Sequence, residues 1–375
     1  MQQNTTEIFR DAPVPKAVLS NVIPSIISMI MVLIYNLADT FFIGQTKNAL
    51  MVAAVSVATP AFLLFMAVGM LFGIGGTSFI SRMLGEGQEE RAKHASAFCF
   101  WTGLAVGIIS MILIVIFAEP VCKAIGASPD TIEYATQYLR IVAIGIPFLI
   151  ISNAFSNIIR SEGRAKTAMS GMIIGNMANV ILDPVMILLL GWNVAGAAIA
   201  TVIAQGISVV LCLIYIVTKA KILLPEKRHF ALDRGLYADL LAQGFSMGFM
   251  SSIIYVGSIV LQPGINSLGY ETIAGHTAAR KLFSFSMMPL SSMAQAVNTY
   301  VAQNRGADNR ERVHKGIRYA YLFCFSVTIA LIICVTPFAP TLVHLISGSS
   351  DPTVLGNGAR YLRVAIPVSY THLTL

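Results

Sequence analysis

The sequence has few charged residues for its length. Of its 375 residues only 11% are Asp, Glu, Lys or Arg, whereas 56% are hydrophobic. An ordinary soluble domain carries about 25% charged residues, so this shortage excludes a typical water-soluble protein. The apolar residues gather into long runs, and a run of about 20 residues can cross the hydrocarbon core of a bilayer as a helix. The composition therefore predicts an all-α integral membrane protein.

Cysteine is also scarce, and the five cysteines are widely spaced. Four of them fall inside apolar runs, and Cys122 has no evident partner outside the membrane, so we expect neither disulfides nor a structural metal site. The polar N-terminus lacks a short apolar stretch with a cleavage site, so we expect no signal peptide. The glycine-rich segment "FGIGGTSF" lies within an apolar run and lacks the context of a phosphate-binding loop. We therefore expect no cofactor and no ATP-driven pump.

Ten apolar runs organise the chain. Nine of them are complete, and the tenth begins near Val354 and is cut off by the end of the chain. The complete runs are at 17–44, 50–80, 94–118, 132–158, 166–190, 195–218, 240–267, 272–302 and 315–337.

The chain repeats itself at a shift of 221 positions. "GEGQEERAKHA" begins at Gly85 and "GADNRERVHKG" begins at Gly306, and the same shift carries Arg91 onto Arg312. Because the shift spans six helices, an even number, both copies enter the membrane with the same orientation. The repeat predicts two pseudo-symmetric six-helix bundles, of which the second is truncated, with about ten of twelve helices present. We expect an N-terminal lobe at 1–218, a basic cytoplasmic linker at 219–239 and an incomplete C-terminal lobe at 240–375, in which the residues after about Val368 do not belong to the fold.

The net charge of +7 is unevenly distributed. If the N-terminus is cytoplasmic, only Lys47 and Lys123 fall in the outer loops, whereas eighteen basic residues fall on the inner side. Such an excess of cytoplasmic Lys and Arg is the usual topology signal, and it places the N-terminus in the cytoplasm and the chain in the cytoplasmic membrane. It also predicts contact with anionic lipid and no binding of nucleic acid. The inner set is Arg10, Lys16, Arg82, Arg91, Lys93, Arg160, Arg164, Lys166, Lys219, Lys221, Lys227, Arg228, Arg234, Arg305, Arg310, Arg312, Lys315 and Arg318.

Two acidic residues, Asp39 and Asp183, lie inside the apolar runs, and both are expected in the outer half of the bilayer. On the helix of Asp183, Asn176 and Asn179 precede it at spacings that stack all three on one face. Exposing these polar side chains to lipid would cost too much free energy, so this helix face must line a cavity or a helix interface. Two neighbouring carboxylates in an apolar site can exchange protons, and with amide oxygens they also suit sodium, so the coupling ion is either of the two.

The motifs together resemble the multidrug and toxic compound extrusion (MATE) family, over essentially the whole chain. They are "NLADTFFIG" from Asn36, "GEGQEERA" from Gly85, the stretch from "YLR" at Tyr138 to "GIPF", "NIIRSEGRAK" from Asn157 and "NVILDPVMI" from Asn179. The seventh run contains no acid, which is similar to the DinF-like and MepA-like bacterial branch. The resemblance implies a non-enzymatic antiporter, and it implies cation-coupling roles for Asp39, Tyr138, Asn157, Asn179 and Asp183.

The expected substrates are small amphipathic, often cationic drugs, exported by a protein that acts as a monomer. Residues proposed for the substrate cavity are Asn153, Asn176, Phe283, Met287, Met288 and Arg280. Two alternatives remain open. A lipid-linked precursor flippase of the same superfold would need a strongly cationic central cavity, and an intramembrane aspartyl protease would need its two aspartates face to face with a GxGD segment, whereas Asp183 follows "VIL".

Overall fold

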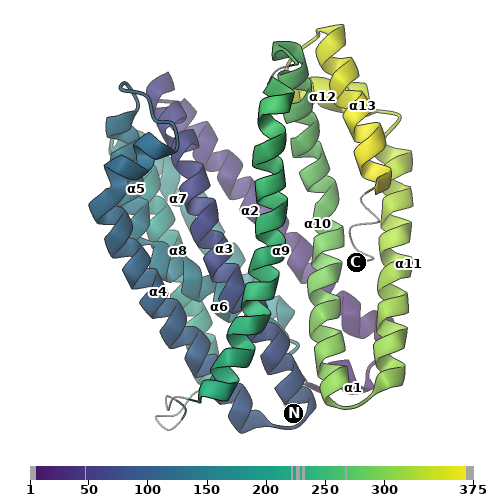
Figure 1. The fold of residues 1–375 in the computed structure, drawn as a ribbon. Helices are drawn as coiled ribbons and strands as arrows, with labels where there is room; N and C mark the ends of the chain where they lie inside the picture. Colours follow the sequence, from purple (N-terminus) through teal and green to yellow (C-terminus); the bar gives the residue numbers. More distant parts are fainter. Residues whose placement is uncertain are drawn as a thin grey trace. The chain divides into compact units, whose positions relative to one another are not determined.

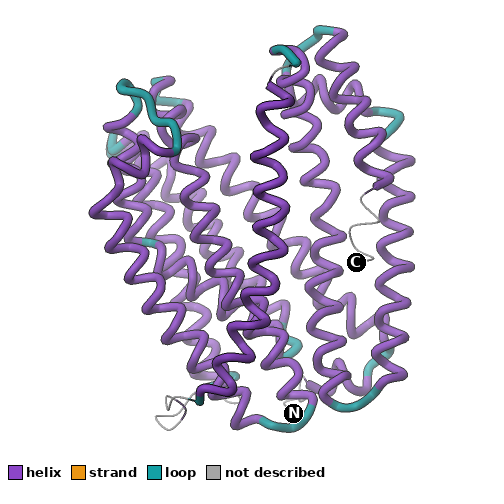
Figure 2. The backbone as a smooth tube through the Cα atoms, in the orientation of Figure 1, coloured by secondary structure: helices purple, strands orange, loops and turns teal. Residues whose placement is uncertain are grey.

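The computed structural model describes residues 6–46, 48–220, 223–224, 229, 233–266 and 268–368. Throughout these ranges the regular structure is helical and no strand occurs, as Figure 2 shows, so the all-α prediction is confirmed. The elements labelled in Figure 1 and the short ones between them are α1 (Thr6–Asp11), α2 (Val14–Gly44), α3 (Ala49–Gly85), α4 (Glu89–Ala124), α5 (Ile132–Ile144), α6 (Ile146–Ser161), α7 (Ala165–Asp183), the π-helix η1 (Pro184–Leu189), α8 (Asn193–Thr218), α9 (Arg234–Asn266), α10 (Tyr270–Gly306), α11 (Arg310–Val335), α12 (Ala339–Ser347) and α13 (Pro352–Val368).

Several helices are long and apolar enough to span a membrane. Within the described residues there are five such spans, and six if the bent pair α5–α6 counts as one. The five are Val14–Gly44, Glu89–Ala124, Ala165–Leu189, Asn193–Thr218 and Arg310–Val335. The short helices α1 and α12 were not predicted, because neither is long enough to form an apolar run. Residues 369–375, for which we predicted a departure from the fold, lie outside the described residues.

The fourth apolar run is a broken helix and not the single helix that its composition suggests. α5 and α6 meet at Gly145 with an angle of 49° between them. Pro147 lies in the first turn of α6, where its missing N–H is tolerated. A Cβ at Gly107 of α4 would come within 2.7 Å of the Pro147 Cα, so the two backbones touch at this point. The bend and this contact together fix the direction of α6, which carries several polar side chains.

The fifth run also departs from a regular α-helix. It is α-helical to Asp183 and continues as a π-helix from Pro184 to Leu189. Because Pro184 has no N–H, it cannot donate to the carbonyl one turn earlier, and the chain accommodates it by widening. Asp183 is therefore the last residue before the change in helix geometry.

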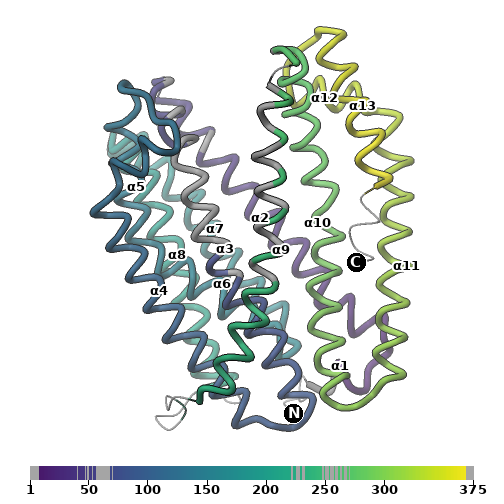
Figure 3. Tube along the Cα trace, viewed as in Figure 1, coloured from purple at the N-terminus to yellow at the C-terminus, as the bar shows by residue number. Residues whose placement is uncertain are grey.

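The chain divides into two compact units. One comprises Met1–Ile8 and Ile27–Gly248, and the other comprises Phe9–Ile26 and Phe249–Leu375. The order of the helices along the chain can be followed by colour in Figure 3. The predicted lobes differ from these units in two places. Phe9–Ile26 groups with the second unit, and the first unit extends through the predicted linker to Gly248. A division by sequence repeat cannot anticipate this grouping, because α2 is a continuous helix on both sides of Ile26.

The repeated sequence forms the same kind of turn in both units. Gly87 follows α3 with φ 72°, and Asp308 follows α10 with φ 51°, and these two residues are 221 positions apart. The residue after each of them is the N-cap of the next helix, α4 or α11. In the second copy the Asn309 side chain accepts a hydrogen bond from the Arg312 backbone N–H at 3.1 Å. The repeat therefore keeps the turn geometry and changes the capping residue.

The beginning of the predicted linker packs into the first unit. Ala220 and Leu223 are fully buried in its hydrophobic core. The side chain of His229 is also fully buried, and its Nε2 lies 2.8 Å from Glu90 Oε2. The backbone carbonyl of His229 accepts a hydrogen bond from His94 Nδ1 at 3.1 Å. These contacts hold the described part of the linker against the first turns of α4.

A single arginine holds residues 9–12 in place within the second unit. Arg312 Nη2 donates to the carbonyl oxygens of Phe9 at 2.9 Å and Ala12 at 2.6 Å, while its Nε donates to Asn304 Oδ1 at 3.2 Å. The fully buried ring of Phe9 packs edge-on against Tyr300, with 6.1 Å between the ring centroids. Figure 1 shows α1 beside the connected ends of α10 and α11. Arg312 thus donates to the Ala12 carbonyl and shares the Phe9 carbonyl with Asn304 Nδ2, which also donates to it at 3.3 Å.

Replacing Arg312 by Ala should destabilise the protein by about 2–3 kcal/mol, because it removes the charge-assisted hydrogen bonds to the Phe9 and Ala12 carbonyls and to Asn304, and only the Phe9 carbonyl keeps another side-chain donor, Asn304. Thermal unfolding in detergent measures the loss of stability. The rate of proteolytic cleavage in the segment before Val14 measures how firmly that segment is held. The matched control is Arg310→Ala, which breaks an ion pair to Asp308 whose side chains are 87% and 88% exposed and should have almost no effect. Equal effects of the two substitutions would contradict this account.

Candidate functional site

Asp183 is the most deeply buried carboxyl group of the first unit, with no exposed surface at all. Its Oδ1 accepts a hydrogen bond from Asn179 Nδ2 at 3.3 Å. Its Oδ2 is buried and has no hydrogen-bond partner among the described residues. A buried carboxylate oxygen without a donor is costly, so it marks a place where a proton or a cation can be accommodated.

Asn179 connects Asp183 to the next helix. Its Nδ2 lies 3.5 Å from Thr201 Oγ1 of α8, and only 2% of the residue is exposed. α7 and α8 can approach this closely because Gly175 has no side chain. A Cβ there would overlap the Ser208 hydroxyl and come within 2.9 Å of the Ala204 carbonyl oxygen. The glycine therefore sets the spacing that lets Asn179 meet Thr201.

Asp39 belongs to the same neighbourhood. It lies on α2 and interacts electrostatically with Asp183. Tyr35 of α2 and Tyr138 of α5 lie within range of both carboxyl groups. Asp39 Oδ1 is buried and lacks a hydrogen-bond partner in the part of the chain that the structure describes. The structure thus brings Asp39, Asp183, Asn179 and Tyr138 into one region of the first unit.

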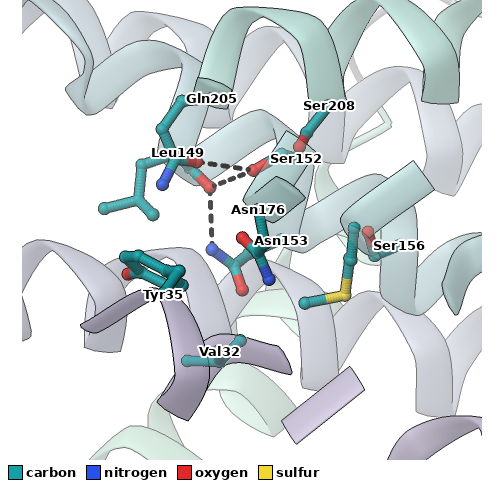
Figure 4. Close-up of a pocket in the computed structure, with 10 residues that line it drawn as sticks. Val32, Tyr35, Leu149, Ser152, Asn153, Ser156, Asn176, Gln205 and Ser208 are labelled. Carbon is teal, nitrogen blue, oxygen red and sulfur yellow. Dashed lines mark hydrogen bonds between the residues drawn. The ribbon is translucent and has the colours of Figure 1, made fainter. Parts of the chain in front are cut away.

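A cleft opens beside this group. Its empty volume is about 470 Å³, and this volume includes the open solvent at its mouth. Two of the predicted cavity residues, Asn153 and Asn176, line it. Figure 4 shows the side chains around it: α2 contributes Val32 and Tyr35, α6 contributes Leu149, Ser152, Asn153 and Ser156, α7 contributes Met172 and Asn176, and α8 contributes Gln205 and Ser208.

The two asparagines of α6 donate back to their own helix. Asn153 Nδ2 donates to the Leu149 carbonyl at 2.9 Å, and Asn157 Nδ2 donates to the Asn153 carbonyl at 2.8 Å. Asn157 also packs against α3, where a Cβ at Gly73 would come within 2.7 Å of Asn157 Nδ2. Asn157 does not line the cleft, so its predicted part in cation coupling stays a prediction.

Sequence reasoning missed the polar residues that α8 contributes. Thr201 meets Asn179, and Gln205 and Ser208 line the cleft. Their spacing of four and then three residues places them on one face of a helix. This spacing could have identified them in the sequence as a polar helix face. Tyr35 was missed as well, although it precedes Asp39 by one turn.

The other predicted cavity residues belong to the second unit. Phe283, Met287, Met288 and Arg280 all lie on α10, and Arg280 is exposed. Phe283 packs edge-on against Tyr361 of α13, with 6.3 Å between the ring centroids. None of these four lines the cleft of the first unit, so their role in binding substrate stays a prediction.

The unpaired oxygens fit a hard monovalent cation or a proton. Asp39 Oδ1, Asp183 Oδ2 and Asn179 Oδ1 are buried and without hydrogen-bond partners among the described residues. Carboxylate and amide oxygens are the donors that sodium prefers. A proton on either carboxyl group would also remove the unpaired charge. Across the described residues, no group of three or more His, Cys, Asp or Glu side chains could hold a metal ion.

A helical membrane bundle that keeps an unpaired carboxyl group beside an open cleft has the features of a transporter. Known proteins share both its sequence pattern and its fold. The family model described as MatE matches residues 24–185 and 247–371. The chain therefore belongs to the MATE family of membrane transporters, whose members are not enzymes.

Individual relatives cover nearly the whole chain. The multidrug export protein MepA of Staphylococcus saprophyticus is 25% identical over 370 residues, which is 98% of this chain and 80% of that protein. MepA of Staphylococcus haemolyticus is 26% identical over 365 residues, 96% of this chain and 78% of that protein. A MOP superfamily transporter from Pyrococcus furiosus shares the fold with a TM-score of 0.91 at 24% identity, covering 99% of this chain and 82% of that one.

A second buried acid lies outside the membrane-spanning segments. Glu162 follows α6, is 5% exposed, and places Oε2 3.7 Å from Arg164 Nε. Burial raises the pKa of Glu162 to about 7, against the opposing effect of the Arg164 guanidinium. Because this folded-state pKa lies above the ordinary value of 4.5, the folded protein binds the proton more tightly than the unfolded chain does. The stability that Glu162 contributes is therefore lost as the pH rises through about 7.

Replacing Glu162 by Gln should stabilise the protein at alkaline pH, because the amide never carries the buried charge. We expect the gain to be larger at pH 8 than at pH 5 by on the order of 2 kcal/mol. Thermal unfolding at both pH values measures it. The control is Glu86→Gln in the turn after α3, where the carboxyl group is partly exposed and forms an ion pair with Arg82. A gain that does not change with pH would show that Glu162 does not titrate in this range.

Proposed function

We propose that this transporter exports small amphipathic compounds by antiport, driven by protons or sodium ions that bind at Asp39 and Asp183. The observation that supports this proposal most directly is the fully buried Asp183 carboxyl group. One of its two oxygens has no hydrogen-bond donor among the described residues. Asn179 donates to its other oxygen and also meets Thr201, and Tyr138 lies within range of its charge. The staphylococcal relatives are multidrug export proteins, which agrees with this proposal.

Transport follows from the different preferences of the two ligands. The ion stabilises the conformation in which the carboxyl groups converge, and the exported compound stabilises a conformation in which it fills the cleft. Neither ligand needs to touch the other, because each only needs to bind one state of the helical bundle more tightly. The protein would act as a monomer in the cytoplasmic membrane with its N-terminus in the cytoplasm, as the distribution of basic residues predicts.

A lipid-linked precursor flippase is a weaker candidate. Such a protein would hold a pyrophosphate in a cavity rich in basic side chains. None of the ten described residues that line the cleft is basic. Arg140 and Arg280 are both exposed and do not contribute to the cleft.

The first test uses purified protein in liposomes. Efflux of ethidium and of dansylamide is followed under an imposed proton gradient and, separately, under an imposed sodium gradient. We expect one of the two gradients to accelerate efflux of at least one dye. Asp183→Asn is nearly isosteric, keeps a partner for Asn179 and removes the charge, so it should fold normally and reduce gradient-driven efflux by about tenfold or more.

The matched control is Asp130→Asn, which removes the same charge from an exposed position. It should transport like the wild type. Undiminished efflux by the Asp183→Asn variant would refute the coupling role. Efflux that responds to neither gradient in the wild type would refute antiport.

A further inference from the structure

A track of polar side chains leads away from Asp183 along α8. Asn179 joins Asp183 to the start of the track, because its Nδ2 lies 3.3 Å from Asp183 Oδ1 and 3.5 Å from Thr201 Oγ1. Three more polar residues follow Thr201 on the same face of α8, at spacings of four, three and four residues. They are Gln205, Ser208 and Cys212. The track thus runs from the buried carboxyl group toward the end of α8 that the basic residues predict to be cytoplasmic.

α6 forms the facing side of this polar track. Ser152 Oγ lies 3.4 Å from Gln205 Oε1, and Figure 4 shows the two side chains in contact. One turn further along α6, Ser156 Oγ lies 3.8 Å from Cys212 Sγ. Hydroxyl, amide and thiol groups therefore follow one another from Asp183 to Cys212. Such groups can accept or donate hydrogen bonds, so a proton or a small cation leaving the carboxyl group finds polar partners along the way.

A positive charge lies at the inner end of the track. Arg160 follows Ser156 by one turn of α6, and its Nε donates to the Ser156 carbonyl oxygen at 3.2 Å. This hydrogen bond directs the side chain back toward the track, where its charge interacts with Cys212. Ser156 is 1% exposed and Cys212 is 3% exposed, so the charge acts in a region with little water. A guanidinium group stays protonated in proteins, so this charge is present at every physiological pH.

The neighbouring charges leave this end of the track positive. Glu162 is the nearest acid along the chain, and its Oε2 lies 3.7 Å from the Nε of a second arginine, Arg164. Burial raises the pKa of Glu162 to about 7, so near neutral pH it carries only part of a negative charge. Two guanidinium groups therefore outweigh one carboxyl group. None of the ten described residues that line the cleft adds a charge of either sign.

We propose that Arg160 is the barrier that prevents the coupling ion from passing straight through the first unit along this track. The inference rests on the proposed function, in which a proton or a sodium ion binds at Asp183. A cation that moves inward from there meets a like charge, and repulsion between charges is stronger where water is excluded. A single arginine excludes cations from some water-conducting pores by the same repulsion. The ion then reaches the cytoplasm only through the conformational change that also moves the exported compound.

Ion leak in the absence of substrate tests the proposal. The purified full chain is reconstituted into liposomes that contain a pH-sensitive or a sodium-sensitive dye, with the membrane potential clamped by potassium and valinomycin. The decay of an imposed proton gradient or sodium gradient is followed with no drug present. The wild type should hold both gradients nearly as well as protein-free liposomes. Arg160→Gln should leak at least one of the two ions about tenfold faster, because a like charge beside the path is removed.

Three further variants separate charge from fold. Arg160→Lys keeps a positive charge and should hold the gradients like the wild type. Lys166→Gln removes an exposed positive charge outside the track and should hold them as well. Ser156→Asp leaves Arg160 in place and adds a carboxylate one turn before it, where the two side chains can pair. This variant should leak, and it replaces Arg160→Gln in the comparison if that variant does not fold.

A folded Arg160→Gln variant that leaks neither ion faster than the wild type would overturn the proposal. An equal leak through Arg160→Lys or Lys166→Gln would overturn it too, because the charge at this position would then not be the cause. A failure of the proposed function gives a different result, since gradient-driven efflux by the wild type would be absent while the leak rates could still be compared. A charge-dependent leak in a protein without such efflux would retain the barrier and lose the antiport mechanism.

Discussion

A carboxyl group removed from water must be paired, neutralised or bound to a cation, because its desolvation costs several kcal/mol. The first unit contains such a group at Asp183, and the surrounding side chains and helix contacts determine its environment. Asn179 donates to one oxygen, Thr201 holds Asn179 in turn, and Gly175 lets α7 and α8 approach closely enough for this contact. The change to a π-helix at Pro184 begins at the next residue. Asp183 therefore lies at the boundary between the α-helix and the π-helix.

The same two helices also carry part of the cleft. On α7, Asn176 lies three residues before Asn179, and on α8, Gln205 lies four residues after Thr201. The proposed ion site and the cleft are thus formed by neighbouring segments of the same two helices, and a displacement of α7 against α8 would change both. This arrangement gives a physical route by which an ion and a substrate can compete without sharing a single atom of protein.

The chemistry of the residues around Asp183 could be predicted from the sequence more fully than their geometry. Asp183 and its asparagines were recognisable because a carboxyl group in an apolar run is rare and the spacing of three and four residues defines one helix face. Thr201 could not be singled out, because a hydroxyl in an apolar helix is ordinary and its importance depends on where Asn179 lies. The bend at Gly145 was hidden for a similar reason, since the run from 132 to 158 is apolar on both sides of it.

The long helices were predictable from composition, whereas the contacts that set the boundaries of the two compact units were not. Arg312 was interpreted as part of the sequence repeat and as a topology signal, because nothing in the sequence shows that the carbonyls of Phe9 and Ala12 lie within its reach. The same limit applies to Phe9–Ile26, which groups with the second unit although the helix that contains most of it continues into the first. Contacts between segments far apart in the chain decide both features, and local patterns do not encode such contacts.

Calorimetry of substrate binding tests most directly whether Asp183 holds the coupling ion. Dansylamide is titrated into wild type and into Asp183→Asn, in two buffers of different ionisation enthalpy, with either sodium or potassium as the only metal cation. If the account is right, the wild type either releases a proton on binding or loses affinity when sodium replaces potassium, and the variant shows neither effect. Substrate binding by the wild type that releases no proton and is insensitive to sodium would contradict it, as would an unchanged ion dependence in the variant.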